Sequence, residues 1–122
     1  MGISFKVEGL AKAQIYLKLK NKQADVIIGN AMNNVALFVE DEVKQSIAGR
    51  KAEPASVDTG RFLNSVDSKS NKESATIFSD LNYSQFLEYG TSRIPERRHF
   101  RNSLSRNKSK ITASIQAALR KL

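Results

Sequence analysis

The most regular pattern of apolar and polar positions in the sequence lies between residues 28 and 43. Its apolar residues recur at steps of four, three, four and four, which is the spacing of one face of an amphipathic helix. Helical spacing continues toward residue 10, while Gly49, with Pro54 soon after, marks the end of the pattern. The sequence therefore predicts helix over residues 11–48, as one helix or as two joined near Asn21. The clearest part of the apolar face consists of Ile28, Met32, Val35, Val39 and Val43.

Three short segments have the pattern of β-strands. Residues 3–7, ISFKV, alternate in polarity as a half-buried strand does. The segments VDSKS and SATIF stand on either side of a polar turn at residues 71–73 and together predict a β-hairpin. The second arm is the stronger strand, because its residues are mostly β-branched or aromatic.

Two short helices are expected on either side of the hairpin. The first is a helical turn in VDTGRFLNSV, which the side chain of Asp58 or Thr59 can cap. The second is YSQFLEYG, in which Gly90 can take the left-handed conformation that ends a helix. In the first, Phe62, Leu63 and Val66 are expected to face inward. In the second, Tyr83, Phe86 and Leu87 share a face, and Phe86 and Leu87 are expected to belong to the core.

The last predicted element is an amphipathic helix from about Glu96 to Leu122. Its apolar residues lie on one stripe and its basic residues lie largely off it, which gives the helix a cationic back. An interruption is expected near Asn107. The stripe consists of Phe100, Leu104, Ile111, Ile115, Ala118 and Leu122.

Composition indicates a small single-domain protein. A chain of 122 residues is long enough for one modest core, so we expect one domain spanning residues 1–122. Cysteine is absent, which excludes disulfides and thiolate zinc sites. The first ten residues do not have the pattern of a secretory signal, and the apolar runs are too short to cross a bilayer, so a soluble protein that is not exported is expected. Apolar residues make up 40%, slightly below the globular average, which suggests that a neighbour covers part of the surface.

The net charge of +8 is concentrated at the C-terminal end. Of the 20 Lys and Arg residues, eight follow Glu96, where no acid occurs, so the first 96 residues hold 12 of each sign. Such asymmetry is typical of a protein that meets a polyanion or an acidic partner, and also of a simple solvated face. The candidate face for DNA or an acidic protein consists of Arg101, Arg106, Lys108, Lys110, Arg120 and Lys121.

Residue patterns typical of catalysis or metal binding are missing from the sequence. His99 is the single histidine, without the spacing of a zinc site, and is expected to be a surface or packing residue. No G-x-S-x-G elbow and no phosphate-binding glycine loop occur. The triplet 40–42, EDE, points in directions 100° apart along a helix and is expected to be a solvated face. We therefore expect no enzyme, no cofactor and no metal.

Two motifs carry a resemblance to a known family. VDTGRFLNSV, followed by a hairpin and then by YSQFLEYGTSRIPERRHFRNSL, resembles the neck or tail-completion family of long-tailed double-stranded DNA phages. The family proline before the final aromatic is replaced here by His99. The resemblance covers the chain end to end in element order, with motifs of about 40 residues. The residues taken as the family motif are Asp58, Thr59, Gly60, Arg61, Glu88 and Gly90.

The resemblance implies a fold, a function and partners. The fold is α+β, with a long N-terminal helix packed on a small antiparallel sheet (hairpin plus N-terminal strand), a short middle helix and a basic amphipathic C-terminal helix. The function is that of a phage or prophage virion structural protein, a ring-forming subunit of the head–tail junction through which DNA passes. Partners are other copies of the chain and the neighbouring connector and tail proteins, without a membrane. The protein would reside in the virion, and in the host cytoplasm during assembly.

Ring formation gives an account of the aromatic and arginine residues around residue 90. Aromatic and Arg side chains dominate protein interfaces, because they combine contact area with directed polar contacts. A small basic nucleic-acid-binding module is the alternative function, supported by the pI near 9.9. The C-terminal helix would face DNA in one interpretation and an acidic virion protein in the other. The expected interface residues are Tyr83, Tyr89, Thr91, Arg93, Arg97, Arg98 and Phe100.

Overall fold

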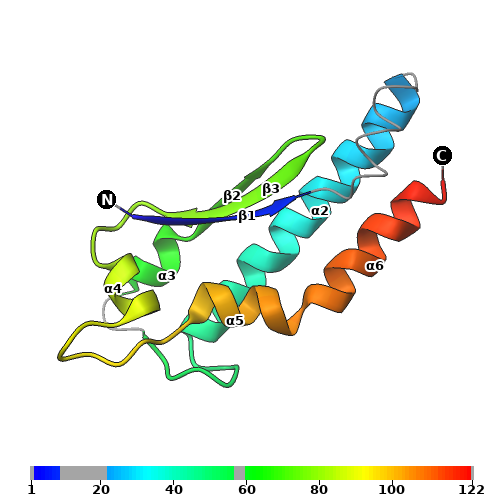
Figure 1. Cartoon of the computed structure of the whole chain (residues 1–122). Helices are drawn as coiled ribbons and strands as arrows, with labels where there is room; N and C mark the ends of the chain where they lie inside the picture. Colours follow the sequence, from blue (N-terminus) through cyan, green and yellow to red (C-terminus); the bar gives the residue numbers. More distant parts are fainter. Residues whose placement is uncertain (1, 9–21, 57–59, 122) are drawn as a thin grey trace.

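The computed structural model describes residues 2–8, 22–56 and 60–121 of the chain. The fold is α+β, as expected: one long helix and a pair of C-terminal helices lie beside a three-stranded antiparallel sheet (Figure 1). This long helix, α2 (Lys22–Ile47), packs against the sheet and against both C-terminal helices. No helix in the described ranges is long and apolar enough to cross a membrane.

The sheet has the strand order β1-β3-β2, with β1 (Ile3–Glu8), β2 (Asp67–Ser70) and β3 (Ser74–Ser79). Both pairings are antiparallel, and Phe5 lies opposite Ile77 in the register. The predicted hairpin is therefore confirmed. Its turn is closed by Asn71, whose Oδ1 accepts hydrogen bonds from the backbone N–H of Glu73 and Ser74 at 2.8 and 2.9 Å.

The apolar stripe of α2 forms the centre of the core. Each of its predicted residues is at most 2% exposed, because this face meets the sheet and the C-terminal helices. The helix ends before Gly49, where φ is +84° and a Cβ would lie 2.8 Å from the Cβ of Ala55. Whether helix continues N-terminal to residue 22, as one piece or two, lies outside the described residues.

Four shorter helices follow α2 in the described part of the chain. They are α3 (Arg61–Ser65), α4 (Ser84–Tyr89), α5 (His99–Arg106) and α6 (Lys108–Leu119). The expected break near Asn107 is confirmed, and the side chain of Asn107 explains how it is held. Its Nδ2 donates to Glu42 Oε1 on α2 at 2.9 Å and to the Ser103 carbonyl at 2.8 Å.

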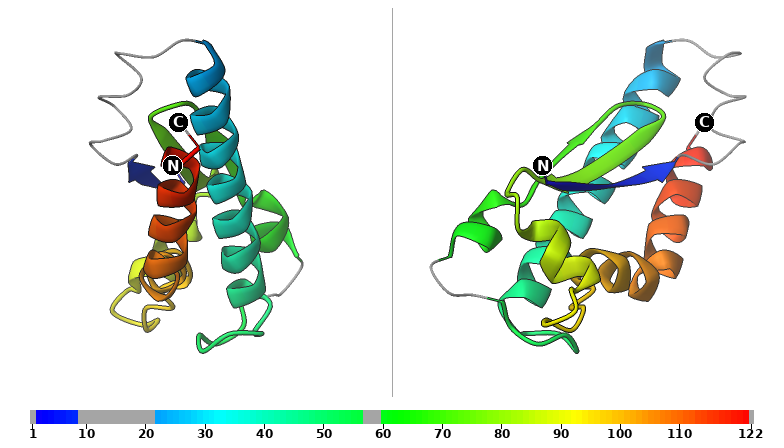
Figure 2. Two further views of the ribbon diagram at one scale, coloured as in Figure 1. Left: turned by 90° about the vertical axis from the view of Figure 1, so that its right-hand side faces the viewer. Right: turned by 60° about the vertical axis from the view of Figure 1, so that its left-hand side comes forward.

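The two ends of the molecule have different elements. Helix α4 and the loop that follows it lie at one end, and the N-terminal end of α2 lies at the other (Figures 1 and 2). The ring of Phe100 stacks on Phe5 with centroids 5.4 Å apart and contacts Phe62 at 6.5 Å. These contacts join α5, β1 and α3, so a continuous cluster of aromatic rings forms the core at the end of the molecule that carries α4.

Candidate protein interface

Helix α4 and the loop after it expose four large apolar side chains, which we call the aromatic corner: Tyr83, Phe86, Tyr89 and Ile94. Their exposed fractions range from 38 to 52%. The three aromatic residues follow one another at steps of three, so they cover a sector of about 120° of the helix surface. The inner face of the helix carries Leu87, which packs against the core. The corner is thus an apolar surface built on a packed helix.

The loop from residue 90 to 98 is held by hydrogen bonds at both ends. Gly90 has φ +76°, and a Cβ there would lie 2.7 Å from the backbone N of Glu96 and 2.8 Å from the carbonyl of Ile94. Both the backbone angle and the space therefore require glycine. Thr91 closes the turn, because its Oγ1 accepts from the N–H groups of Arg93 and Ile94, each at 3.1 Å. The predicted end of α4 at Gly90 is confirmed.

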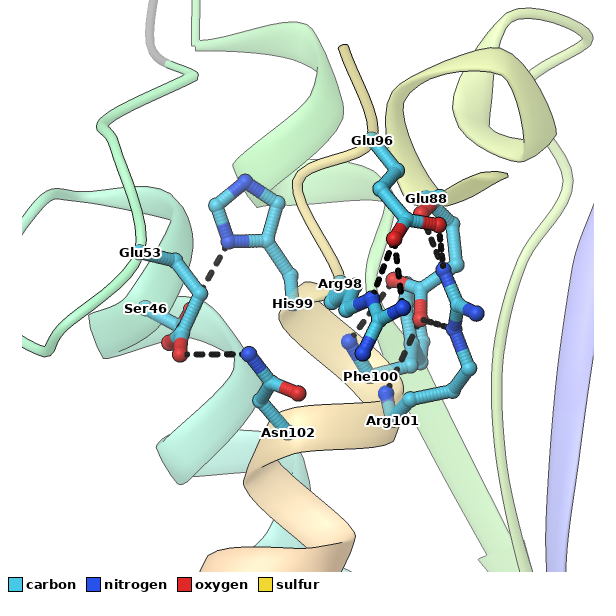
Figure 3. A network of polar contacts seen from close by, with 9 residues as sticks. All are labelled: Ser46, Glu53, Glu88, Glu96, Arg98, His99, Phe100, Arg101 and Asn102. Atoms are coloured by element: carbon cyan, nitrogen blue, oxygen red, sulfur yellow. Dashed lines mark hydrogen bonds and ion pairs between the residues drawn. The ribbon is translucent and has the colours of Figure 1, made fainter. Parts of the chain in front are cut away.

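The buried carboxylate of Glu88 joins this loop to α5. Glu88 is 0% exposed, and its two oxygens accept from the backbone N–H groups of Phe100 and Arg101, each at 2.9 Å (Figure 3). These N–H groups lie in the first turn of α5, where the helix itself offers no acceptor. The negative charge also lies at the positive end of the helix dipole. Glu88 therefore caps α5 from a different helix.

Arg101 closes the same cluster on the solvent side. Its Nε donates to Glu88 Oε2 at 3.0 Å, and its Nη2 donates to the Glu88 carbonyl at 2.6 Å and to Glu96 Oε2 at 3.1 Å. The guanidinium also lies over the ring of Tyr89, 4.5 Å from the ring centre, in a cation–π contact. Arg101 thus fixes one edge of the aromatic corner, and its charge is matched within the chain.

A second polar network lies behind the loop, around His99, which is 0% exposed. Ser46 on α2 donates its hydroxyl proton to Glu53, so its oxygen must accept from His99 Nδ1–H, 2.7 Å away. The other ring nitrogen, Nε2, then accepts from the Ser56 hydroxyl at 2.8 Å. Arg97 Nη1 in turn donates to Ser56 Oγ at 3.2 Å. From Arg97 through Ser56, His99 and Ser46 to Glu53, each group therefore donates a hydrogen bond to the next. The imidazole is neutral, with its proton on Nδ1.

The pKa values of the network agree with this arrangement. Burial lowers the pKa of His99 to about 4, the charge of Glu53 opposes this, and the charge of Arg97 adds to it. Burial alone would raise the pKa of Glu53, but hydrogen bonds from Arg106, Ser46 and Asn102 and the charge of Arg106 lower it to about 2. At neutral pH the network thus holds a neutral imidazole and an ionised carboxylate.

Five of the predicted interface residues lie on the surface. Tyr83, Tyr89, Thr91, Arg93 and Arg98 are all exposed at this end of the molecule. Arg98 also has φ +56°, the one positive value for a residue other than glycine in the described ranges, directly before α5.

Other predicted site residues need correction. Phe100 is 0% exposed and belongs to the core, so it offers no surface to a partner. Arg97 is half-buried, and its Nη1 donates to the Ala55 carbonyl at 2.7 Å. Arg101 is engaged by Glu88, and Arg106 is paired with Glu53 through two hydrogen bonds of 3.0 and 3.2 Å. Phe86, which we expected to face inward with Leu87, is 47% exposed.

The remaining basic residues of the C-terminal segment stay on the surface. The four that are exposed on or just after α6 are Lys108, Lys110, Arg120 and Lys121. Of the first family motif, Asp58 and Thr59 lie outside the described residues, as does their expected capping role. Gly60 has φ +82° and directly precedes α3, whose first residue, Arg61, is exposed.

Three buried polar residues that organise this end of the molecule could not be identified from the sequence pattern. Glu42 is 8% exposed and bonds to Asn107 and Lys51, so the expectation that triplet 40–42 is wholly solvated is wrong for its last residue. Glu53 and Ser46 are also buried. The only sequence signal for Glu53 was its place in the loop shortly after the apolar stripe of α2 ends, and it is a weak one.

Comparisons with known proteins found no match to a family model, to a curated protein or to a solved structure. Within the described part of the chain, no group of three or more His, Cys, Asp or Glu side chains is arranged to hold a metal ion. Function is therefore inferred from the geometry of the chain itself and from its sequence motifs.

Proposed function

We propose that this chain is a virion structural protein of a long-tailed phage or prophage, a ring-forming subunit of its head–tail junction. The observation that carries the proposal is the aromatic corner on a fixed backbone. Four large apolar side chains are exposed there, although Gly90, Thr91 and Glu88 hold the helix and the loop in one conformation. Preorganisation lowers the entropy cost of association, so a rigid apolar surface is well suited to bind a partner.

A ring needs two different surfaces that fit each other, because each subunit contacts its neighbour in a head-to-tail manner. The other exposed large apolar residues in the described ranges are Val26 and Leu37 on α2, at 59 and 55%. They are 11 residues apart, which places them within about 20° of each other around the helix. We propose that this outer face of α2 receives the aromatic corner of the neighbouring subunit. Closure of such contacts would leave a central channel for DNA.

Absence of cysteine from the chain allows a direct test of this contact. A variant with Phe86→Cys and Leu37→Cys should form an intermolecular disulfide ladder under mild oxidation at high protein concentration. The matched control combines Phe86→Cys with Lys69→Cys, because Lys69 is exposed on β2 and lies on neither surface. A ladder from the first pair and only dimers or monomers from the second is the expected result. Equal products from both pairs would contradict the proposed contact.

A small nucleic-acid-binding module remains the second candidate function. The four exposed cations of the α6 region favour it, since Lys and Arg bind phosphates in any sequence context. Arg101 and Arg106 are paired with carboxylates of the chain, so their charges are already balanced. This pairing argues against a strong phosphate-binding site. We therefore place structural assembly first.

A further inference from the structure

A groove of about 500 Å³ lies between the C-terminal half of β1 and helices α5 and α6. Its apolar lining comes from one strand residue and from one stripe of the two helices: Val7, Leu104, Ile111 and Ile115. The turn at Asn107 sets α5 and α6 at an angle, so both helices contribute to the same groove (Figure 2). None of the four side chains of the aromatic corner lines the groove, although Arg101, which does line it, also contacts Tyr89 of the corner.

The strand that borders the groove is an edge strand. β1 pairs with β3 through one of its edges, and no strand in the described ranges pairs with the other. The free edge of a strand presents alternate backbone N–H and C=O groups that a further strand can bind. An extended segment that pairs with β1 directs every second side chain to one face. This arrangement favours an extended occupant over a helical one.

The charge of the groove favours an acidic occupant. Its lining contains the cations Lys6, Arg101 and Lys108 and one carboxylate, that of Glu8. Lys6 and Glu8 form an exposed pair of 3.7 Å, and Arg101 is bound by Glu88. Lys108 is exposed and forms no ion pair with a described residue. A second copy of the chain, with its net charge of +8, would meet like charge here, whereas an acidic protein would not.

We propose that this groove binds an extended segment of a different protein in which acidic and apolar residues alternate. The backbone of the segment adds a strand to β1, its apolar side chains enter the groove beside Leu104 and Ile111, and its carboxylates lie near Lys108. The inference does not depend on the ring contact, because the two surfaces and the two partners differ.

A fluorescent peptide that alternates Glu and Val is the first probe, with its binding measured by anisotropy. The expected result is saturable binding that weakens with salt, and no binding of the same peptide with Lys in place of Glu. Lys108→Glu should weaken binding by about fivefold, as expected for one partly exposed charge contact. The matched control is Lys110→Glu, because Lys110 is exposed on the same helix and does not line the groove.

Amide hydrogen exchange identifies the binding mode. On saturation with the acidic peptide, alternate amides of β1 should gain protection, since only every second N–H of an edge strand points outward. A peptide with the same composition in blocked order, without alternation, should give no such protection. Absence of binding by the acidic peptide at millimolar concentration would overturn the proposal. Equal loss of affinity in both lysine variants, or protection outside β1, would overturn it as well.

Discussion

Glu88 Oε2 lies 2.9 Å from the backbone nitrogen of Arg101 and 3.0 Å from its Nε. One carboxylate therefore caps α5 and binds the side chain of the same arginine. Because Arg101 also lies against Tyr89, this bond connects the buried end of α5 to the exposed aromatic corner. Glu88, a residue of the family motif, thus binds the backbone N–H groups of Phe100 and Arg101, which lie 12 and 13 residues further along the chain.

Replacement of Glu88 should be strongly destabilising. Glu88→Ala leaves the backbone N–H groups of Phe100 and Arg101 and the Nε of Arg101 without their acceptor, and removal of one partner of a buried pair costs about 3–5 kcal/mol. Urea unfolding should show a clearly lower midpoint. The matched control is Glu96→Ala, which removes the exposed acceptor of the same arginine and should change the midpoint little. Equal shifts in both variants would contradict the capping role.

Acid should destabilise the protein through His99. The pKa of His99 is about 4 in the folded chain and near 6.5 when exposed, so the unfolded state binds more protons between these values. Stability is therefore greatest above pH 6.5 and falls as the pH drops toward 4, by at most about 3 kcal/mol. Chemical unfolding measured between pH 6.5 and 4 should show that the free energy of unfolding of the wild-type chain decreases as the pH falls.

The control for this slope is His99→Gln, which lacks the titrating group. This variant should lose the pH dependence between 6.5 and 4 but keep the loss at lower pH that Glu53 causes. Glu53 has a depressed pKa of about 2, so its contribution is present above pH 4.5 and disappears as the pH falls toward 2. An unchanged slope in the His99→Gln variant would assign the acid sensitivity to other groups.

Ser103 offers a stabilising substitution. Its side chain is 0% exposed, and its Oγ has no hydrogen-bond partner among the described residues. A buried hydroxyl without a partner is costly, so Ser103→Ala should raise the free energy of unfolding by about 1 kcal/mol. Thermal unfolding measures the change. The control is Ser46→Ala, which removes a hydroxyl that bonds to both Glu53 and His99 and should therefore destabilise.

Any binding of duplex DNA should be weak and only moderately dependent on salt. If the four exposed cations of the α6 region all contact phosphates, the slope of log K against log salt is about −4. Lys110→Gln should reduce the magnitude of the slope by about 1. Arg106→Gln should leave it unchanged, because Arg106 is bound to Glu53. A much steeper slope, or an effect of Arg106→Gln on the slope in folded protein, would favour the nucleic-acid-binding alternative.

The sequence predicted those elements whose signals are local. The stripe of α2 is visible in its periodicity, and Gly90 and Asn107 mark real helix ends. The polar networks were missed, because the partners of Asn107 and Arg106 are 65 and 53 residues away in the chain. No periodic pattern carries that information.

The exposure of single residues was also beyond the sequence pattern. Helix α4 has only six residues, too few for periodicity to separate an inward from an outward face, and Phe86 was placed on the wrong side. Charge counting placed Arg101 and Arg106 on a cationic face, because the carboxylates that pair with them, on Glu88 and Glu53, belong to other segments. Contacts between segments distant in the sequence determine both the exposure of Phe86 and the pairing of the two arginines.

Electron microscopy of particles made without this polypeptide tests the central claim most directly. When its gene is inactivated in the encoding phage or prophage, we predict filled heads and separate tails, with infectivity restored by the wild-type chain. A chain with Phe86→Glu and Tyr89→Glu, confirmed as folded by circular dichroism, should fail to restore attachment, because charge on the aromatic corner prevents the contact between subunits. Infectious particles with firmly attached tails in the absence of the polypeptide would contradict the account.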